Sequence, residues 1–332
     1  MNRLRSYFHF AAFALLLAAC GHDTDPFDGS FLIDRFGPFQ LVDSLTVSAA
    51  TVDFAGGQTV FFTATFNKRI NWVVEITGQQ SGAVKSITGF SSELGPDNAV
   101  WDGTTTKLPL FRVEPCVARL IIPEEDSLSM SVDVAVLSGR VYEGNVFADF
   151  EAASPNIVVR NFEFEFTPNT GVTDLVPAAQ GQKSLLLQGT DGVVDNYFVG
   201  LIEVLAPITG SQYIPMPSNV PEDVHFNAFV YGTGDPYTIA IFDFYSDSNN
   251  DGLYNPNVDR LFTTGNIPVT WRGWRQYSLK MSELGISEAQ LAKLVAMRVV
   301  LISDNNSQPT PRVQVSFATD FLTFTKGQPL KP

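Results

Sequence analysis

The stretch Val60-Phe61-Phe62-Thr63-Ala64-Thr65-Phe66 alternates apolar residues at even positions with a more polar set at odd positions. Side chains two residues apart lie on the same face of a β-strand, so the even positions form one apolar face. The same alternation recurs over residues 72–76 and 130–136, and Gly, Asn, Asp and Pro separate these runs. Half-buried strands joined by such turns predict an antiparallel β-sandwich.

The composition extends this pattern to the whole chain. Its 332 residues are too many for one typical core, so we expect two domains. Hydrophobic residues make up 45% of the chain and charged residues 17%, which excludes wholesale disorder, and 27 phenylalanines favour strands. The formal net charge of -14 argues against nucleic acid as a partner.

A second domain begins near the run Val158-Val159-Arg160-Asn161-Phe162-Glu163-Phe164-Glu165-Phe166, after a linker at residues 152–156. Further strand-like runs and turns continue to Pro332 and suit a jelly roll. We therefore predict an all-β chain, with an immunoglobulin-like sandwich over residues 39–150 followed by a jelly roll over residues 158–332.

One short helix is predicted in the second domain. Ser287 and Gln290 fit a capping box, and Ile286 with Leu291 fits a hydrophobic staple. Leu291, Leu294 and Val295 supply the inward stripe of this helix.

The N-terminus carries a secretory signal. Arg3 and Arg5 precede an apolar run that is too short to span a bilayer comfortably, and small residues follow at a cleavage point. The ending Leu17-Ala18-Ala19-Cys20 resembles the lipobox of bacterial lipoproteins, in which the cysteine is lipidated. The alternative is a plain signal peptide that ends near a cysteine. We interpret residues 1–19 as the signal peptide and residues 20–38 as a tether.

The acidic segment after Cys20, residues 21–29, resembles the export signal that sends Bacteroidetes lipoproteins to the cell surface. The resemblance implies an outer-membrane protein that faces the exterior and is attached by its lipid alone. The alternative is a solvated linker. Cys116 then has no intramolecular partner, and its alternating surroundings predict a buried, unreactive thiol.

Both domains resemble known families. Residues 72–78 with the later Trp101-Asp102-Gly103 are similar to the immunoglobulin-like domain of flagellar hook-capping proteins. The segments Asn161-Phe162-Glu163, Trp271-Arg272-Gly273-Trp274 and 320–325 make the second domain similar to galactose-binding-like jelly rolls, which include many carbohydrate-binding modules. Members of that family often hold a structural calcium, and the resemblance nominates Glu163 and Asp320 as ligands.

A separate calcium loop is predicted from the residues themselves. The segment from Asp247 to Asp259 begins with the pattern D-x-N-x-D-G, which places hard oxygen donors at alternate positions before a glycine bend. The twelfth position is Val258 and the acid comes one residue later, so a helix-loop-helix sensor is not expected. The alternative is a solvated turn between two strands. The expected structural calcium ligands are Asp247, Asn249, Asp251, the Leu253 carbonyl and Asp259.

Aromatic residues are the candidates for binding glycan, because sugars stack their apolar faces on flat rings. Trp271 lies in a predicted loop beside Arg272, and we expect these two residues to contact ligand. Tyr254 either joins them or covers the calcium loop. Trp274 begins a strand and is expected in the core.

Catalysis has little support in the sequence. Few histidines remain after processing, which argues against a histidine-centred triad or a zinc cluster. We therefore predict a non-catalytic surface lipoprotein that binds a glycan or polysaccharide through its jelly roll. The alternatives are a structural or adhesive protein that binds a protein partner, and a glycosidase or lyase with unplaced carboxylates. A shallow aromatic groove favours the first, a large apolar patch the second, and carboxylates facing across a cleft the third.

Overall fold

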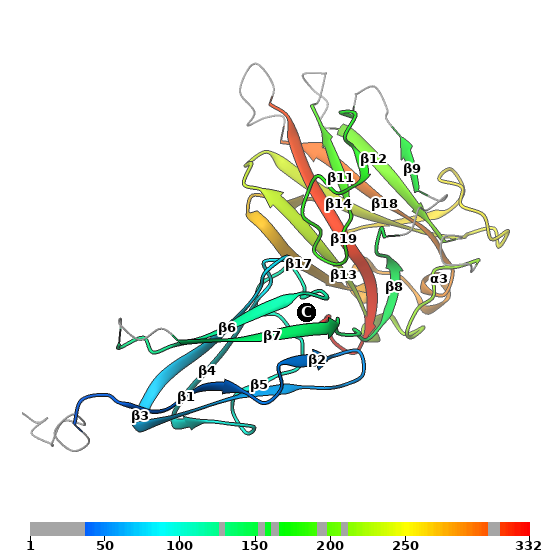
Figure 1. Cartoon of the computed structure of the whole chain (residues 1–332). Helices are drawn as coiled ribbons and strands as arrows, with labels where there is room; N and C mark the ends of the chain where they lie inside the picture. Colours follow the sequence, from blue (N-terminus) through cyan, green and yellow to red (C-terminus); the bar gives the residue numbers. More distant parts are fainter. Residues whose placement is uncertain are drawn as a thin grey trace, which may run out of the picture.

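A computed structural model describes residues 37–125, 130–151, 157–160, 166–190, 198–206, 212–304 and 313–332. Cys20 and Glu163 lie outside these residues. The described chain is all-β, with the strands of residues 41–138, coloured blue to green, forming one domain and the strands of residues 145–326, coloured green to red, forming a second (Figure 1). This confirms the predicted fold class. No helix among the described residues is both long and apolar enough to cross a membrane.

The strands of the N-terminal domain form one seven-stranded sheet. In chain order they are β1 (Leu41–Val47), β2 (Thr51–Asp53), β3 (Val60–Gly78), β4 (Val84–Leu94), β5 (Val100–Trp101), β6 (Pro115–Ile121) and β7 (Met130–Ser138). The strand order is β1-β3-β6-β7-β2, with β4 and β5 also pairing with β3. All pairs are antiparallel except β2 with β7.

Strand β3 organises this domain. The two runs expected at residues 60–66 and 72–76 form one continuous strand, whose apolar positions stay on one face throughout. Phe62 and Trp72 are 0% and 1% exposed, so each contributes about 1.5–3 kcal/mol from burial of its side chain. The first half of β3 pairs with β1 and the second half with β6, so this strand ties the domain together.

Cys116 and Trp101 lie in the same core. Cys116 is buried, and burial raises the pKa of its thiol to about 12, with the Glu114 carboxylate adding to the shift. Trp101 packs edge-on against Phe54 and Phe111, with ring centroids 4.8 and 4.7 Å apart. Because its pKa is raised, the Cys116 thiol stays protonated and acts as a small hydrophobic group at neutral pH.

The C-terminal domain is a jelly-roll sandwich of two six-stranded sheets. The described strands of this domain are β8 (Asn145–Ala148), β9 (Ile157–Arg160), β10 (Gly171–Thr173), β11 (Ser184–Gly189), β12 (Phe198–Leu205), β13 (Val224–Thr233), β14 (Thr238–Ser246), β15 (Arg260–Thr263), β16 (Ile267–Pro268), β17 (Arg272–Lys280), β18 (Leu294–Ser303) and β19 (Val315–Lys326). Sheet 1 has the order β10-β11-β19-β13-β17, with β8 beside β19. Sheet 2 has the order β15-β14-β18-β12-β9, with β16 beside β14.

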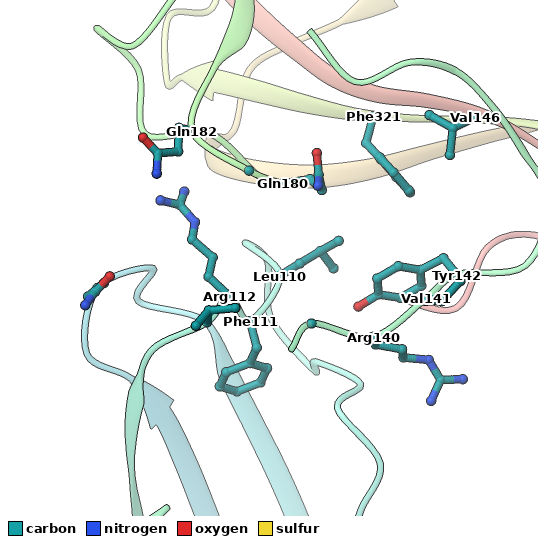
Figure 2. A pocket seen from close by; sticks show the side chains of 14 residues that line it. Leu110, Phe111, Arg112, Arg140, Val141, Tyr142, Val146, Gln180, Gln182 and Phe321 are labelled. Carbon is teal, nitrogen blue, oxygen red and sulfur yellow. The ribbon is translucent and has the colours of Figure 1, made fainter. Parts of the chain in front are cut away.

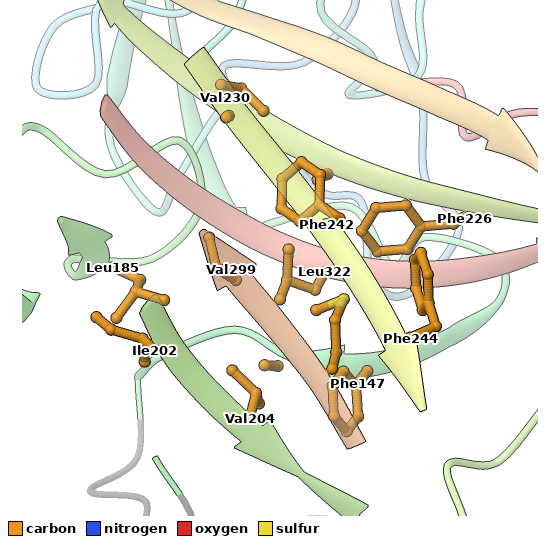
Figure 3. Close-up of a cluster of buried hydrophobic side chains, with 14 of the residues drawn as sticks. Phe147, Leu185, Ile202, Val204, Phe226, Val230, Phe242, Phe244, Val299 and Leu322 are labelled. Carbon is orange, nitrogen blue, oxygen red and sulfur yellow. The ribbon is translucent and has the colours of Figure 1, made fainter. Parts of the chain in front are cut away.

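Aromatic residues from both sheets fill the core between them (Figure 3). The ring of Phe226 in β13 lies 5.3 Å from that of Phe242 and 5.0 Å from that of Phe244, both in β14. These edge-on contacts join sheet 1 to sheet 2. The inner faces are therefore occupied by core packing and are closed to ligands.

The predicted helix is shorter than expected. Helix α3 (Glu288–Leu291) has its capping box, in which Oε1 of Gln290 accepts the Ser287 backbone N–H at 3.0 Å. Leu294 and Val295 are buried in strand β18 instead, where Leu294 pairs opposite Ser246. Pairing with the sheet thus overrides the local helical spacing. Two short 3-10 helices, Pro221–Asp223 and Met281–Leu284, complete the described helical segments.

The chain enters the second domain earlier than expected. The predicted N-terminal domain ended at residue 150, whereas β8 pairs with β19, and Phe147 and Phe150 belong to the jelly-roll core. Residues 145–150 are therefore part of the C-terminal sandwich. Their apolar side chains complete the jelly-roll core, and this burial places them in the second domain although they precede the predicted linker.

The two domains contact each other through a small apolar cluster that includes Leu110, Phe321 and Leu330. Backbone hydrogen bonds join Leu110 N to Ala179 O at 2.8 Å and Thr105 N to Pro332 O at 3.1 Å. The C-terminus therefore lies between the domains (Figure 1).

Candidate functional site

A concave surface of the jelly roll lies on the outer face of sheet 1. We call it the sheet groove; its volume is about 310 Å³. It is lined by Asn169, Leu175, Val176, Leu186, Gln188, Tyr231, Thr233, Ser316, Phe317 and Ala318. Every one of these residues is uncharged. The lining therefore combines apolar side chains with hydroxyl and amide groups.

Strand alternation places these groups outward. Along β13, Phe226, Ala228 and Val230 point into the core, so Tyr231 points away from it. Its cross-strand partner in β17 is Trp274, and their rings lie 5.3 Å apart at 64°. The two rings thus form an outward-facing aromatic pair at one side of the groove.

A hydrogen bond secures the loop beside this pair. The indole Nε1 of Trp274 donates to the carbonyl of Pro177 at 2.7 Å. Leu175 and Val176, which precede Pro177, line the groove. Trp274 therefore holds the loop that forms one wall of the groove.

The two tryptophans occupy different faces from those expected. Trp271 packs against the jelly-roll core, donates to the Val230 carbonyl at 3.3 Å and has the Arg275 guanidinium 5.2 Å from its ring centroid. Trp274, expected in the core, is half-buried on the outer face instead. They are three positions apart, an odd spacing that favours opposite faces of an extended chain. Arg272 is exposed and pairs opposite Thr233, which lines the groove.

Tyr254 lies elsewhere, over the outer face of sheet 2. Its hydroxyl donates to Oε1 of Glu203 at 2.7 Å, and its ring lies 5.0 Å from that of Tyr245. Arg298 also bonds Glu203 at 3.0 Å and donates to the Tyr245 hydroxyl at 2.5 Å. Burial and the hydrogen bond to Glu203 raise the pKa of Tyr254. No contact between Tyr254 and Trp271 is found among the described residues.

The predicted calcium loop is organised by internal hydrogen bonds. Asp247 is 3% exposed; its Oδ2 accepts the Gly252 N–H at 2.8 Å and the Tyr213 hydroxyl at 2.9 Å. Burial alone would raise the pKa of Asp247, but these donors outweigh it and lower that pKa. Gly252 has φ +71°, which favours glycine at this bend.

The other predicted ligands contact neighbouring polar groups of the same loop. Asp259 accepts the backbone N–H groups of Ser248 and Asn255, and Oδ2 of Asp251 accepts the Asn249 amide at 2.7 Å. The Leu253 side chain is exposed. Within the described part of the chain, no three His, Cys, Asp or Glu residues are grouped so as to hold a metal ion. The bound calcium stays a prediction.

Asp320, which the family resemblance nominated, is buried beneath the outer face of sheet 1. Its Oδ2 accepts the Gln180 N–H at 2.8 Å, and its Oδ1 accepts its neighbour's N–H, from Phe321, at 2.7 Å. Burial raises the pKa of Asp320 well above its ordinary value, and the nearby Glu151 carboxylate adds to the shift. The acidic residue found near Asp320 is therefore Glu151, which the sequence analysis did not single out.

Comparison with solved structures finds carbohydrate-binding modules of β-sandwich type. A structure described as carbohydrate-binding modules from the β-sandwich superfamily aligns over 86% of this chain and 97% of that chain, with 12% identity and a TM-score of 0.39. SGBP-B from a complex xyloglucan utilization locus in Bacteroides uniformis aligns over 87% and 73%, with 13% identity and a TM-score of 0.36. The family 30 carbohydrate-binding module of a cellulosomal cellulase of Clostridium thermocellum aligns over 55% and 97%, with 14% identity and a TM-score of 0.36. No family model matches the chain, and no curated protein matches it.

Proposed function

We propose that this chain is a non-catalytic, lipid-anchored protein of the bacterial cell surface that binds a neutral carbohydrate in the sheet groove. The observation that carries the proposal is the uncharged lining of the groove, which places the Tyr231 ring among amide and hydroxyl groups. Pyranose rings have apolar faces and a rim of hydroxyls, so an aromatic ring with flanking polar groups matches both features.

The lining also favours binding over hydrolysis. Glycoside hydrolysis in most enzymes uses two carboxyl groups that flank the scissile bond. Neither Asp nor Glu is among the described residues that line the sheet groove. Asn169, Gln188 and Ser316 supply neutral hydrogen-bonding groups, which recognise hydroxyls without acid–base chemistry.

The anchor rests on Cys20 and its signal sequence. A single acyl chain gives weak membrane binding, whereas the multiple chains of a lipidated N-terminal cysteine support stable attachment. Replacement of this cysteine, Cys20→Ser, is expected to release the chain from the membrane and abolish incorporation of labelled fatty acid. Unchanged incorporation of the label would contradict the anchor without affecting the sheet groove.

The binding proposal is tested on the Cys20→Ser chain, which is soluble if the anchor is correct. Host, plant and microbial glycans are screened on an array and by affinity gels containing polysaccharide, in the presence of calcium. We expect saturable binding that falls at least tenfold in Tyr231→Ala. Trp271→Ala is the matched aromatic variant, since Trp271 packs at the core edge rather than in the groove.

The outcomes separate the candidate sites and functions. Loss of binding in Trp271→Ala, with Tyr231→Ala unaffected, would move the site to Trp271 and Arg272, as the sequence predicted. Loss only in Tyr254→Phe would move it to sheet 2. Absence of binding to every glycan tested would overturn the proposal and favour the protein-binding alternative. The exposed Val113 and Val141 are the surface candidates for that alternative.

A further inference from the structure

A second cavity, of about 500 Å³, lies between the two domains (Figure 2). We call it the junction cavity. Its volume lies within the range of roughly 300–1,000 Å³ that is common for small-molecule sites, and such sites occur preferentially at domain interfaces. Leu110, Val141 and Phe321 supply apolar parts of its lining, and Arg112, Tyr142 and Gln180 supply polar parts.

Several polar groups of the junction cavity have unused hydrogen-bonding capacity. Within the described part of the chain, Nε of Arg112 and Oε1 of Gln180 are buried atoms without a hydrogen-bond partner. Arg112 uses Nη2 to donate to the Ala178 carbonyl at 2.9 Å, which holds its guanidinium across the domain junction. Nε of Arg140, which also lines the cavity, is a third such atom. Buried polar atoms are normally satisfied, so unsatisfied atoms gathered at one cavity indicate that a ligand or water completes them.

Tyr142 adds a third polar group. Its ring packs edge-on against Phe321, with centroids 5.9 Å apart, and its hydroxyl points into the space between the domains (Figure 2). No hydrogen bond from this hydroxyl is found among the described residues. Burial raises the pKa of Tyr142, so the phenol stays protonated and able to donate.

The charge of the lining is unusual for so acidic a chain. The net charge of the chain is -14, yet neither Asp nor Glu is among the residues of the described ranges that line the junction cavity. The carboxylate of nearby Glu114 already accepts hydrogen bonds from Ser81 and from the backbone N–H groups of Gln80 and Arg112. Glu151 likewise accepts the backbone N–H groups of Gln182 and Lys183.

The two arginines of the lining have different roles. Arg140 pairs with Asp102 at 2.7 Å, and its guanidinium points away from the cavity (Figure 2). Arg112 has no ion pair among the described residues, and its guanidinium lies between the domains (Figure 2). Arg112 is therefore the cation available to an anionic ligand.

We propose that the junction cavity binds a small hydroxylated carboxylate, such as a uronic acid residue of an acidic glycan. The carboxylate accepts from Arg112, hydroxyls donate to Oε1 of Gln180 and accept from Tyr142, and the carbon skeleton lies against Leu110 and Phe321. Guanidinium–carboxylate bonds are charge-assisted and stronger than neutral ones, which gives the site its preference for acids. This site and its ligand are distinct from those of the sheet groove.

The test is calorimetric titration of the Cys20→Ser chain with galacturonic acid and its di- and trisaccharides. Galactose oligomers of the same size are the neutral arm, and gluconate is the free hydroxy-acid arm. We expect saturable binding of the acids, weakened by added salt, and no competition from the neutral oligomers. Preference for gluconate over galacturonic acid would assign the site to free hydroxy acids rather than to glycan residues.

Three variants locate the binding. Arg112→Gln removes the charge but keeps an amide for the Ala178 carbonyl, and we expect at least a tenfold loss of affinity. Tyr142→Phe removes only the hydroxyl, and we expect a loss of about threefold or more, consistent with one neutral hydrogen bond. Arg119→Gln is the charge control, since Arg119 is exposed on β6, and its affinity should match the parent.

The proposal is overturned by an absence of saturable acid binding, by equal binding of the neutral sugars, or by Arg112→Gln binding within twofold of the parent. If Arg112→Gln fails to fold, Tyr142→Phe decides, because it keeps the ring on Phe321. Tyr231→Ala should leave acid binding intact, so failure of this proposal is distinguishable from failure of the sheet-groove proposal.

Discussion

The rings of Tyr231 in β13 and Trp274 in β17 lie 5.3 Å apart at 64° on the outer face of sheet 1. They are 43 residues apart in the sequence, and only the pairing of their strands brings them together. Trp274 also holds Pro177, so one side chain both flanks the sheet groove and fixes its loop wall.

Replacing this tryptophan, in Trp274→Phe, should weaken glycan binding by threefold or more and lower stability by about 1 kcal/mol. The phenyl ring keeps an aromatic surface but cannot donate to Pro177, and one hydrogen bond contributes about that free energy. The measurement pairs glycan titration with urea unfolding. Trp271→Phe loses a comparable indole bond at the core edge and should lower stability without weakening binding.

The buried Glu203–Arg298 pair should dominate the stability of sheet 2. The side chains of Arg298 and Glu203 are 14% and 1% exposed, so Arg298→Met leaves a carboxylate buried without its cation. We expect a loss of about 3–5 kcal/mol. Urea unfolding followed by tryptophan fluorescence measures it, since Trp271 and Trp274 report on this domain.

The pair Arg140–Asp102 is the matched comparison, because its side chains are 32% and 44% exposed. Arg140→Met should cost no more than about 1 kcal/mol, since solvent screens exposed ion pairs. Equal losses in the two variants would show that burial does not set the contribution of these pairs.

His225 should make the C-terminal domain sensitive to mild acid. Burial lowers its pKa below the ordinary 6.5; Lys280 opposite it adds to the shift, and Glu283 partly opposes it. The unfolded chain therefore binds a proton more readily than the folded one, so stability falls as pH drops below 6.5 toward the folded pKa. We expect His225→Gln to flatten this part of the stability–pH curve. A slope as steep in the variant as in the parent would exclude His225 as its source.

Calcium, if it binds the loop from Asp247 to Asp259, should raise the melting temperature. A ligand at one hundred times its dissociation constant adds about 2.7 kcal/mol to the folded state. Calorimetric melting in millimolar calcium and in chelator measures the effect, and Asp251→Ala should abolish it. Asp133→Ala, at an exposed position of β7, is the control. Identical melting temperatures in calcium and in chelator would show that the loop is a hydrogen-bonded turn that binds no calcium.

Much of the fold followed from local pattern. Alternation over residues 60–66 identified β3, and the Ser287–Gln290 capping box marked the start of α3. Where local and long-range forces disagreed, the long-range forces prevailed. Leu294 fits a helical stripe, yet it joins β18, because pairing with β14 satisfies its backbone and buries its side chain.

The sequence by itself predicts the signal segment, and it determined the β-rich architecture and the buried, unreactive Cys116, because these depend on composition and short-range periodicity. Tertiary structure decided which tryptophan faces outward, that β8 crosses into the jelly roll, and that Arg112 meets Gln180 at the domain junction. Alternation shows that Trp271 and Trp274 lie on opposite faces, but not which face is buried. That choice depends on the second sheet packing against Trp271 from the far side, and distant contacts of this kind leave no local pattern.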